Sequence, residues 1–148
     1  MELTKSELLN DLAEQIIETE GLNLGGAKIE YLFASPNITK KIGGKTIKTN
    51  KELNYYSDAD FIIEISQDVF NVISKEDKYN LLFNQLLKVG WSTNENNTET
   101  KYYIAKPDIV TFNAINKKNN GHDWFYRIRE CNSSLYDLNP KEADLFSV

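Results

Sequence analysis

Residues 81 to 90, LLFNQLLKVG, place three polar side chains, Asn84, Gln85 and Lys88, inside an otherwise apolar helical stretch. In an α-helix, residues four apart lie on one face about one turn apart, so Asn84 and Lys88 point the same way and Gln85 flanks them. This is the spacing of the H-E-x-x-H motif, in which two imidazoles bind zinc and the glutamate takes a proton from metal-bound water. The question is what these different side chains do at that spacing.

The side chains at these positions do not suit zinc hydrolysis. An asparagine carbonyl is a weak zinc ligand, and the protonated Lys88 has no lone pair to donate and repels a cation. Gln85 offers no basic oxygen, so general-base catalysis, typically worth ~10²–10⁴-fold, is lost even with a metal bound. We therefore expect no zinc peptidase activity from this helix.

The composition of the whole chain narrows the classes of function. The 148 residues suit one domain, and 41% hydrophobic residues are enough to bury a core. The net charge of -5, with lysines scattered among acidic residues, disfavours nucleic acid as a partner.

The single cysteine, Cys131, allows no intramolecular disulfide and favours a reducing compartment. No apolar run approaches ~18 residues and the start lacks a signal-peptide core, so we predict neither a membrane association nor secretion.

The hydrophobic pattern predicts an α+β fold in which helices pack on a small mixed β-sheet. A helix is expected to begin at Thr4, as N-cap, and to stop at Gly21. A single domain is predicted over residues 1–131, followed by a C-terminal tail, residues 132–148, that a partner orders. The other expected elements are strands over 27–34, 58–66 and 101–105, a loop over 35–57 with a return strand at 45–49, helices over 67–73 and 75–89, a helix beginning at Pro107, and a short helix or strand within 119–131.

Four segments, taken in chain order, resemble the putative phage metallopeptidase family, which consists of small zincin-like proteins of phages and prophages. They are GGAKIEYLFA, DADFIIEIS, KEDKYNLLFNQLLKVG and KPDIVTFNAINKKNNG, and they span roughly residues 25–121. The resemblance implies a minimal zincin-like fold. By register it puts Asn84 and Lys88 in place of two helix histidines, Gln85 in place of the catalytic glutamate, and Pro107 where the family tends to place a third histidine. It thus implies a degenerate member, a pseudoenzyme with no metal, cofactor or catalytic residues.

Two interpretations of the polar helix positions stay open. In the first, Asn84, Gln85 and Lys88 form an ordinary solvated helix face. In the second, they line a remodelled cleft that binds a partner, and Lys88 occupies the place of the metal by pairing with Asp108 or Glu99.

A second group of candidates lies toward the C-terminus. His122 and Cys131 lack metal-ligand spacing, and a structural role is expected for both. Aromatic residues near arginines are core residues by default but can instead anchor a protein interface. The protein-binding candidates are Trp124, Tyr126, Arg127, Arg129, Leu135, Tyr136 and Phe146.

The function predicted from these residues and from the resemblance is that of a non-catalytic phage or prophage protein that acts by protein binding. It would be a virion-associated structural component or a host-directed effector, in the virion or the host cytoplasm, with a phage virion protein or a host protein as partner. The sequence indicates no oligomeric state. The alternative is a metal-dependent hydrolase whose unconventional ligands are drawn from Asp58, Asp60, Glu99, Asp108, His122 and Asp123.

Overall fold

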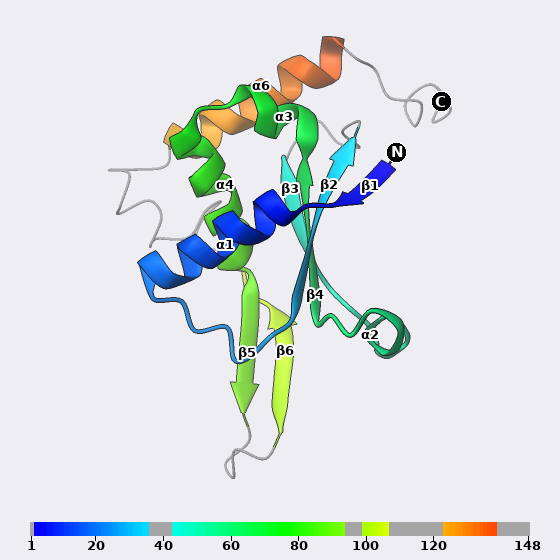
Figure 1. Cartoon of the computed structure of the whole chain (residues 1–148). Coiled ribbons are helices and arrows are strands. Elements are labelled where there is room, and N and C mark those ends of the chain that lie inside the picture. Colours follow the sequence, from blue (N-terminus) through cyan, green and yellow to red (C-terminus); the bar gives the residue numbers. More distant parts are fainter. Residues whose placement is uncertain (1, 36–42, 94–98, 107–122, 139–148) are drawn as a thin grey trace.

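The computed structural model describes residues 2–35, 43–93, 99–106 and 123–138 (Figure 1). It confirms an α+β fold, with a four-stranded mixed sheet in the order β1-β2-β4-β3 and a separate two-stranded sheet, β5-β6. The elements are β1 (Glu2–Lys5), α1 (Glu7–Glu20), β2 (Ile29–Ser35), β3 (Gly44–Lys48), α2 (Lys51–Ser57), β4 (Phe61–Ser66), α3 (Gln67–Val72), α4 (Lys75–Leu86), β5 (Val89–Thr93), β6 (Thr100–Ile104) and α6 (Asp123–Leu138).

The four-stranded sheet has a parallel pair at its centre. β2 and β4 run parallel, with Tyr31 opposite Ile63, and the antiparallel strands β1 and β3 form the two edges. Alternation along β4 turns Ile63 and Ile65 toward the helices, where both are fully buried. Helices α1, α3 and α4 contact this sheet, and α6 packs on α3 and α4 (Figure 1). The hydrophobic core therefore lies between one face of the sheet and the helices.

Helix α1 begins two residues later than the sequence pattern predicts. Ser6 is the N-cap, and its side chain accepts a hydrogen bond from the Leu9 N–H at 3.1 Å. Thr4 does not cap the helix because it pairs with Phe33 in β1, a strand that was not predicted. Gly21 ends the helix as predicted, with a φ of 62° that costs glycine no strain.

Helix α4 begins as predicted and ends early. The Ser74 side chain accepts a hydrogen bond from the Asp77 N–H at 3.1 Å, as an N-cap does. The helix stops at Leu86 instead of the predicted Val89, because residues 89–93 form β5 and pair with β6. Pairing with a distant strand thus overrides the local helical pattern.

Two further helices differ from the predicted elements. Helix α2 lies inside the predicted loop and is capped by Asn50, whose side chain accepts from the Leu53 N–H at 2.8 Å. Helix α6 continues across the boundary predicted after residue 131, and Asn132 within it is fully buried. The helix predicted to begin at Pro107 lies outside the described residues.

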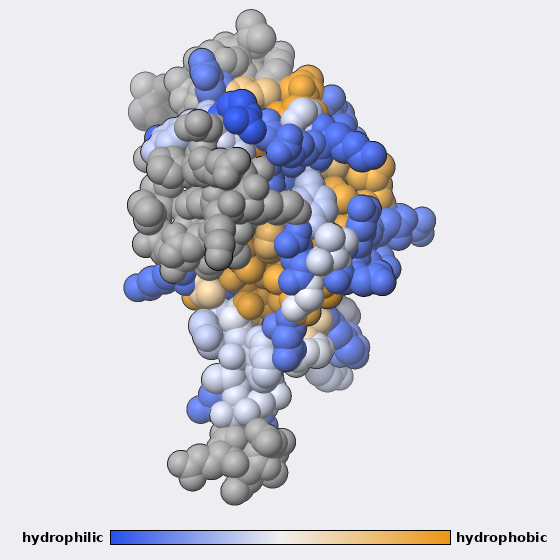
Figure 2. All heavy atoms as spheres, turned by 90° about the vertical axis from the view of Figure 1, so that its left-hand side faces the viewer, coloured by the Kyte–Doolittle hydropathy of each residue, from blue (hydrophilic) through white to orange (hydrophobic). Residues whose placement is uncertain are grey.

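The face that carries the helices is mixed in polarity. In Figure 2 apolar residues gather at mid-height of this face beside hydrophilic residues, and the β5-β6 hairpin projects below. No helix in the described ranges is both long enough and apolar enough to cross a membrane.

Candidate functional site

The polar positions of α4 are buried, so the expectation of a solvated helix face is wrong. Asn84 is 5% exposed and Gln85 is 2% exposed. Helix α4 packs against strands β3 and β4 and also against α6, which leaves it little free surface. Arg127 of α6 fixes the start of α4 through two contacts to Asp77, at 2.9 and 3.3 Å.

Gln85 connects α4 to the edge strand β3. The Thr46 hydroxyl lies 2.9 Å from both the backbone oxygen and Oε1 of Gln85, so its single proton is shared between two acceptors. Gly44 makes this approach feasible, because a Cβ there would come within 2.8 Å of Ile65 Cδ1 and 3.4 Å of Gln85 Cγ. Gln85 therefore anchors the edge strand to the helix.

Asn84 and Lys88 have no such partners among the described residues. Asn84 Oδ1 is buried and accepts no hydrogen bond from these residues, a state that costs roughly 1–3 kcal/mol. The Lys88 side chain is half-buried, and loss of solvent lowers its pKa. No carboxylate in the described ranges, Glu99 included, forms an ion pair with Lys88, and the other predicted partner, Asp108, lies outside those ranges.

These three residues do not fit a zinc ion. Asn84 offers one weak amide oxygen, Gln85 Oε1 is already hydrogen-bonded to Thr46, and a lysine ammonium cannot ligate a metal. Pro107, the fourth position of the resemblance, lies outside the described residues. We derive no hydrolytic step through a metal at this helix.

The edge strand β3 directs some of its backbone hydrogen-bonding groups away from β4; along this edge Gly44 is buried, Thr46 is half-buried and Lys48 is exposed. The Ser66 N–H donates to the Gly43 oxygen and the Thr49 N–H to the Asp60 oxygen, and both pairs continue the register of β3 with β4. Because hydrogen-bonded and non-hydrogen-bonded pairs alternate in antiparallel sheets, Lys45 and Ile47 bond to β4. The backbone N–H and C=O groups that point away from β4 belong to Gly44, Thr46 and Lys48.

This open edge of β3 has no strand paired to it in the part of the chain that the structure describes. β6 contacts β3. Near this contact, Phe61 of β4 lies opposite Lys48 of β3, and its ring centroid is 5.7 Å from that of Tyr102 in β6. α4 packs against the helix-facing side of β3, through Gln85, Thr46 and Gly44, in the arrangement of Figure 1. Such an edge is a template for a further strand.

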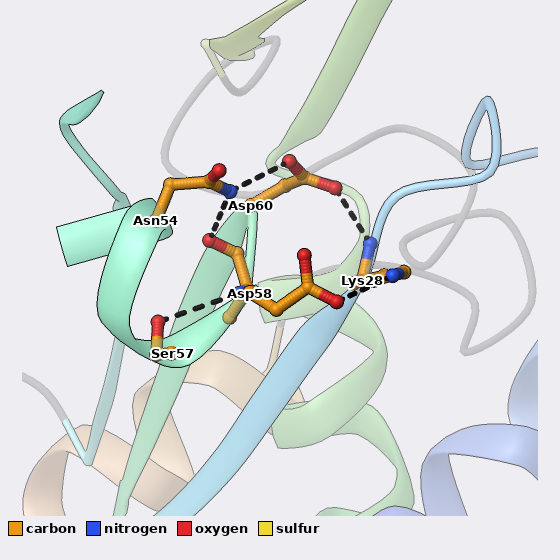
Figure 3. Close-up of polar contacts among 6 residues, drawn as sticks. Lys28, Asn54, Ser57, Asp58 and Asp60 are labelled. Atoms are coloured by element: carbon orange, nitrogen blue, oxygen red, sulfur yellow. Dashed lines mark hydrogen bonds and ion pairs between the residues drawn. The ribbon is translucent and has the colours of Figure 1, made fainter. Parts of the chain in front are cut away.

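A second polar cluster lies at the amino end of β4 (Figure 3). Asp60 accepts from the Lys28 N–H at 2.9 Å and from the Asn54 amide at 3.2 Å. Asp58 caps α2 in the left-handed conformation and pairs with the Lys28 ammonium at 2.6 Å, which raises the Lys28 pKa. Asp58 and Asp60 were candidate metal ligands, and here they join β2, α2 and β4. The described residues contain no group of three or more histidine, cysteine, aspartate or glutamate residues that could hold a metal.

The remaining candidates are spread over α6 and beyond it. Trp124 is 1% exposed and belongs to the core, so it does not offer its ring to a partner. Tyr126 and Arg129 are exposed, whereas Arg127 is held by Asp77. Burial, with a smaller contribution from Asp77, raises the pKa of Cys131. Leu135 and Tyr136 lie in α6 with side chains that are not described, and His122 and Phe146 lie outside the described residues.

Sequence reasoning missed the open edge of β3. The KTIK segment was expected to form a return strand, but its place at the edge follows from the strand order, which no local pattern specifies. The signal that could have found it is Gly44, which packs against the polar helix position Gln85.

Comparison with known proteins identifies the family of this chain. The sequence model of the family described as putative phage metallopeptidase matches residues 1–135, so the chain belongs to this family. Neither the curated proteins nor the solved structures contain a match.

This membership confirms the resemblance and corrects one prediction. The chain was expected not to be an enzyme, but its family is one of putative metallopeptidases, and no observation identifies the chain as a pseudoenzyme. The substitutions at Asn84, Gln85 and Lys88 do not outweigh that finding, because they concern only the positions assigned from the H-E-x-x-H spacing.

Proposed function

We propose that this member of the putative phage metallopeptidase family binds a polypeptide segment in extended conformation, as an added strand on the open edge of β3. The observation that carries the proposal is the outward direction of the backbone groups of Gly44, Thr46 and Lys48. An added strand would form main-chain hydrogen bonds with these groups. Such bonds can form with peptides of many different sequences. Recognition of a peptide backbone is what a peptidase-like fold requires.

The attachment of β3 to α4 supports this role. The contacts of Thr46 with Gln85 and the close packing at Gly44 hold the edge strand in place before a partner arrives. Binding to a preorganised strand costs less conformational entropy than binding to a loose one.

The setting we propose is that of a phage protein whose polypeptide partner is a phage virion protein or a host protein. The protein would then work in the virion or in the host cytoplasm. Its abundance in purified particles distinguishes these settings. Many ordered copies indicate a virion component, and absence together with early expression indicates a host-directed effector.

A binding experiment on the edge strand tests the proposal. The probe is a fluorescein-labelled peptide of about eight residues with valine at alternate positions and glutamine between them, long enough to span β3. Thr46→Pro removes one outward N–H and no ladder hydrogen bond, which an edge strand tolerates. We expect binding about tenfold weaker than that of the wild type.

The matched control for that experiment is Thr46→Val, which removes the hydroxyl and keeps the N–H. Because it loses the anchoring contact to Gln85 and keeps the outward N–H, its affinity for the probe should lie between those of the wild type and Thr46→Pro. Wild-type affinity in Thr46→Pro, with the fold retained by circular dichroism, would refute β3 pairing.

Metal-dependent hydrolysis is the second candidate, and family membership favours it. Its ligands would be Glu99, Asp108, His122 and Asp123, since Asp58 and Asp60 are engaged at the amino end of β4. Stoichiometric metal in the purified protein, together with peptide cleavage that a chelator abolishes, would support it. Purified protein without metal and without cleavage after metal addition would count against it.

A further inference from the structure

The charge of the β3 region is opposite to that of the whole chain. The net charge is -5, yet no acidic residue occurs between Glu30 and Glu52. Five of the 17 lysines and arginines fall in this interval, at Lys40, Lys41, Lys45, Lys48 and Lys51. Two of these five, Lys45 and Lys48, lie in β3 itself, and charges within about a Debye length of ~10 Å act on a bound partner.

Lys45 and Lys48 place this charge on both faces of β3. Side chains alternate along a strand, so Lys48 shares the helix-facing side with Thr46, while Lys45 lies on the opposite side. Lys48 is exposed and forms no ion pair with another residue in the described ranges. An added strand, whose side chains also alternate, would meet a cation on each face.

Lys45 has a carboxylate neighbour that does not fully satisfy it. Its ammonium lies 3.3 Å from Glu64 Oε2, an oxygen that accepts no hydrogen bond, and 43% of the Lys45 side chain is exposed. The ammonium can therefore reach a second carboxylate from solvent.

We propose that the extended segment bound at β3 is acidic, with aspartate or glutamate on the faces that meet Lys45 and Lys48. This inference rests on the proposed function, because it assigns the chemistry of the strand added at the same edge. The outward N–H and C=O groups of β3 match the hydrogen-bonding groups of another polypeptide backbone. A nucleic acid backbone offers no such pattern, so a polypeptide is favoured as the partner. Acidic side chains that meet the lysines of β3 would raise the association rate. They would also favour acidic segments over other segments, because every polypeptide can form the same main-chain hydrogen bonds.

Three labelled peptides test the inference, each with valine at alternate positions and with glutamate, glutamine or lysine between them. At low salt we expect the glutamate peptide to bind about tenfold more tightly than the glutamine peptide, and the lysine peptide to bind more weakly than both. Raising the ionic strength to ~0.3 M should remove most of this difference.

Matched double variants locate the effect on the protein. Lys45→Gln with Lys48→Gln should remove the preference for glutamate, so that the glutamate and glutamine peptides bind this double variant with affinities within about twofold of each other. The control is Lys5→Gln with Lys75→Gln, because Lys5 forms a similar pair with Glu30 at 3.4 Å on the opposite edge strand and Lys75 is exposed on α4. The control should retain the preference.

The outcomes separate the inference from the proposed function. Equal binding of the glutamate and glutamine peptides would overturn the acidic preference and leave strand pairing in place. Failure of all three peptides to bind would overturn both. Displacement of the glutamate peptide by an equal concentration of a short oligothymidylate would show that the lysines serve a nucleic acid, which also overturns the inference.

Discussion

The two polar clusters of this protein differ in how fully their hydrogen bonds are satisfied. At the amino end of β4, both carboxylate oxygens of Asp60 accept hydrogen bonds, and Asp58 is paired with Lys28 (Figure 3). On α4, Asn84 Oδ1 accepts none, although Asn84 is more deeply buried than Asp60.

This difference separates a structural cluster from a candidate binding site. Satisfied polar groups join three elements at the amino end of β4 and stabilise the fold. On α4, by contrast, the unsatisfied buried oxygen of Asn84 lowers stability. The four predictions below test this difference, from the largest expected effect to the smallest.

The largest effect is expected at Asp60. Asp60→Ala removes the acceptor of the Lys28 N–H and of the Asn54 amide, so the free energy of unfolding in urea should fall by roughly 3 kcal/mol. The control is Asp58→Asn, which keeps a residue tolerant of the left-handed conformation and breaks only an exposed ion pair, so its loss should be small. A larger loss in Asp58→Asn than in Asp60→Ala would contradict the assignment.

The same substitution should have opposite effects in the two clusters. Asn54→Leu removes the donor to the Ala59 oxygen and to Asp60, and should lower the free energy of unfolding by about 2 kcal/mol. Asn84→Leu removes an unsatisfied buried acceptor and should raise it by about 1 kcal/mol. Urea denaturation of both variants gives the comparison, and a loss of stability in Asn84→Leu would show that Asn84 is structurally satisfied.

The hydrogen bond between Thr46 of β3 and Gln85 of α4 should contribute about 1 kcal/mol to the free energy of unfolding. Thr46→Val conserves the side-chain volume and removes the hydroxyl that lies 2.9 Å from two oxygens of Gln85. The free energy of unfolding should fall by that amount. Unchanged stability together with unchanged amide exchange in β3 would mean that Gln85 does not anchor the strand.

The smallest expected effect is the pH dependence that Lys88 gives to the stability of the protein. Burial lowers its pKa in the folded protein below the ordinary 10.5, so the folded state releases the proton at a lower pH than the unfolded state. Stability therefore rises as pH increases through the interval between the two pKa values. Lys88→Met should be more stable than the wild type at neutral pH, and this advantage should shrink as pH approaches 10.5. An advantage that does not change with pH would contradict the burial of the ammonium.

The sequence predicted the central elements of the fold well because their signals are local. Ser74 capped α4 and Gly21 ended α1 as predicted, since capping depends on the neighbouring residues alone. The start of α1 was predicted wrongly because Thr4 pairs with Phe33, and that partner is far along the chain. Local patterns do not specify such pairing.

At the candidate site, too, the features that local sequence specifies were predicted, and those that depend on distant segments were not. The spacing of Asn84, Gln85 and Lys88 identified the helix of interest, and the resemblance identified the family. Their burial could not be predicted, because it results from packing of α4 between the sheet and α6. The open edge of β3 also depends on the order of four strands that lie far apart in the sequence.

Amide hydrogen exchange along β3, measured by NMR with and without the glutamate peptide, tests the central claim most directly. In the free protein, the Lys45 and Ile47 amides should be protected by β4, and the Thr46 and Lys48 amides should exchange rapidly. Saturation with the peptide should protect Thr46 and Lys48. Binding of the peptide without any change in the exchange of these two amides would contradict strand addition at β3.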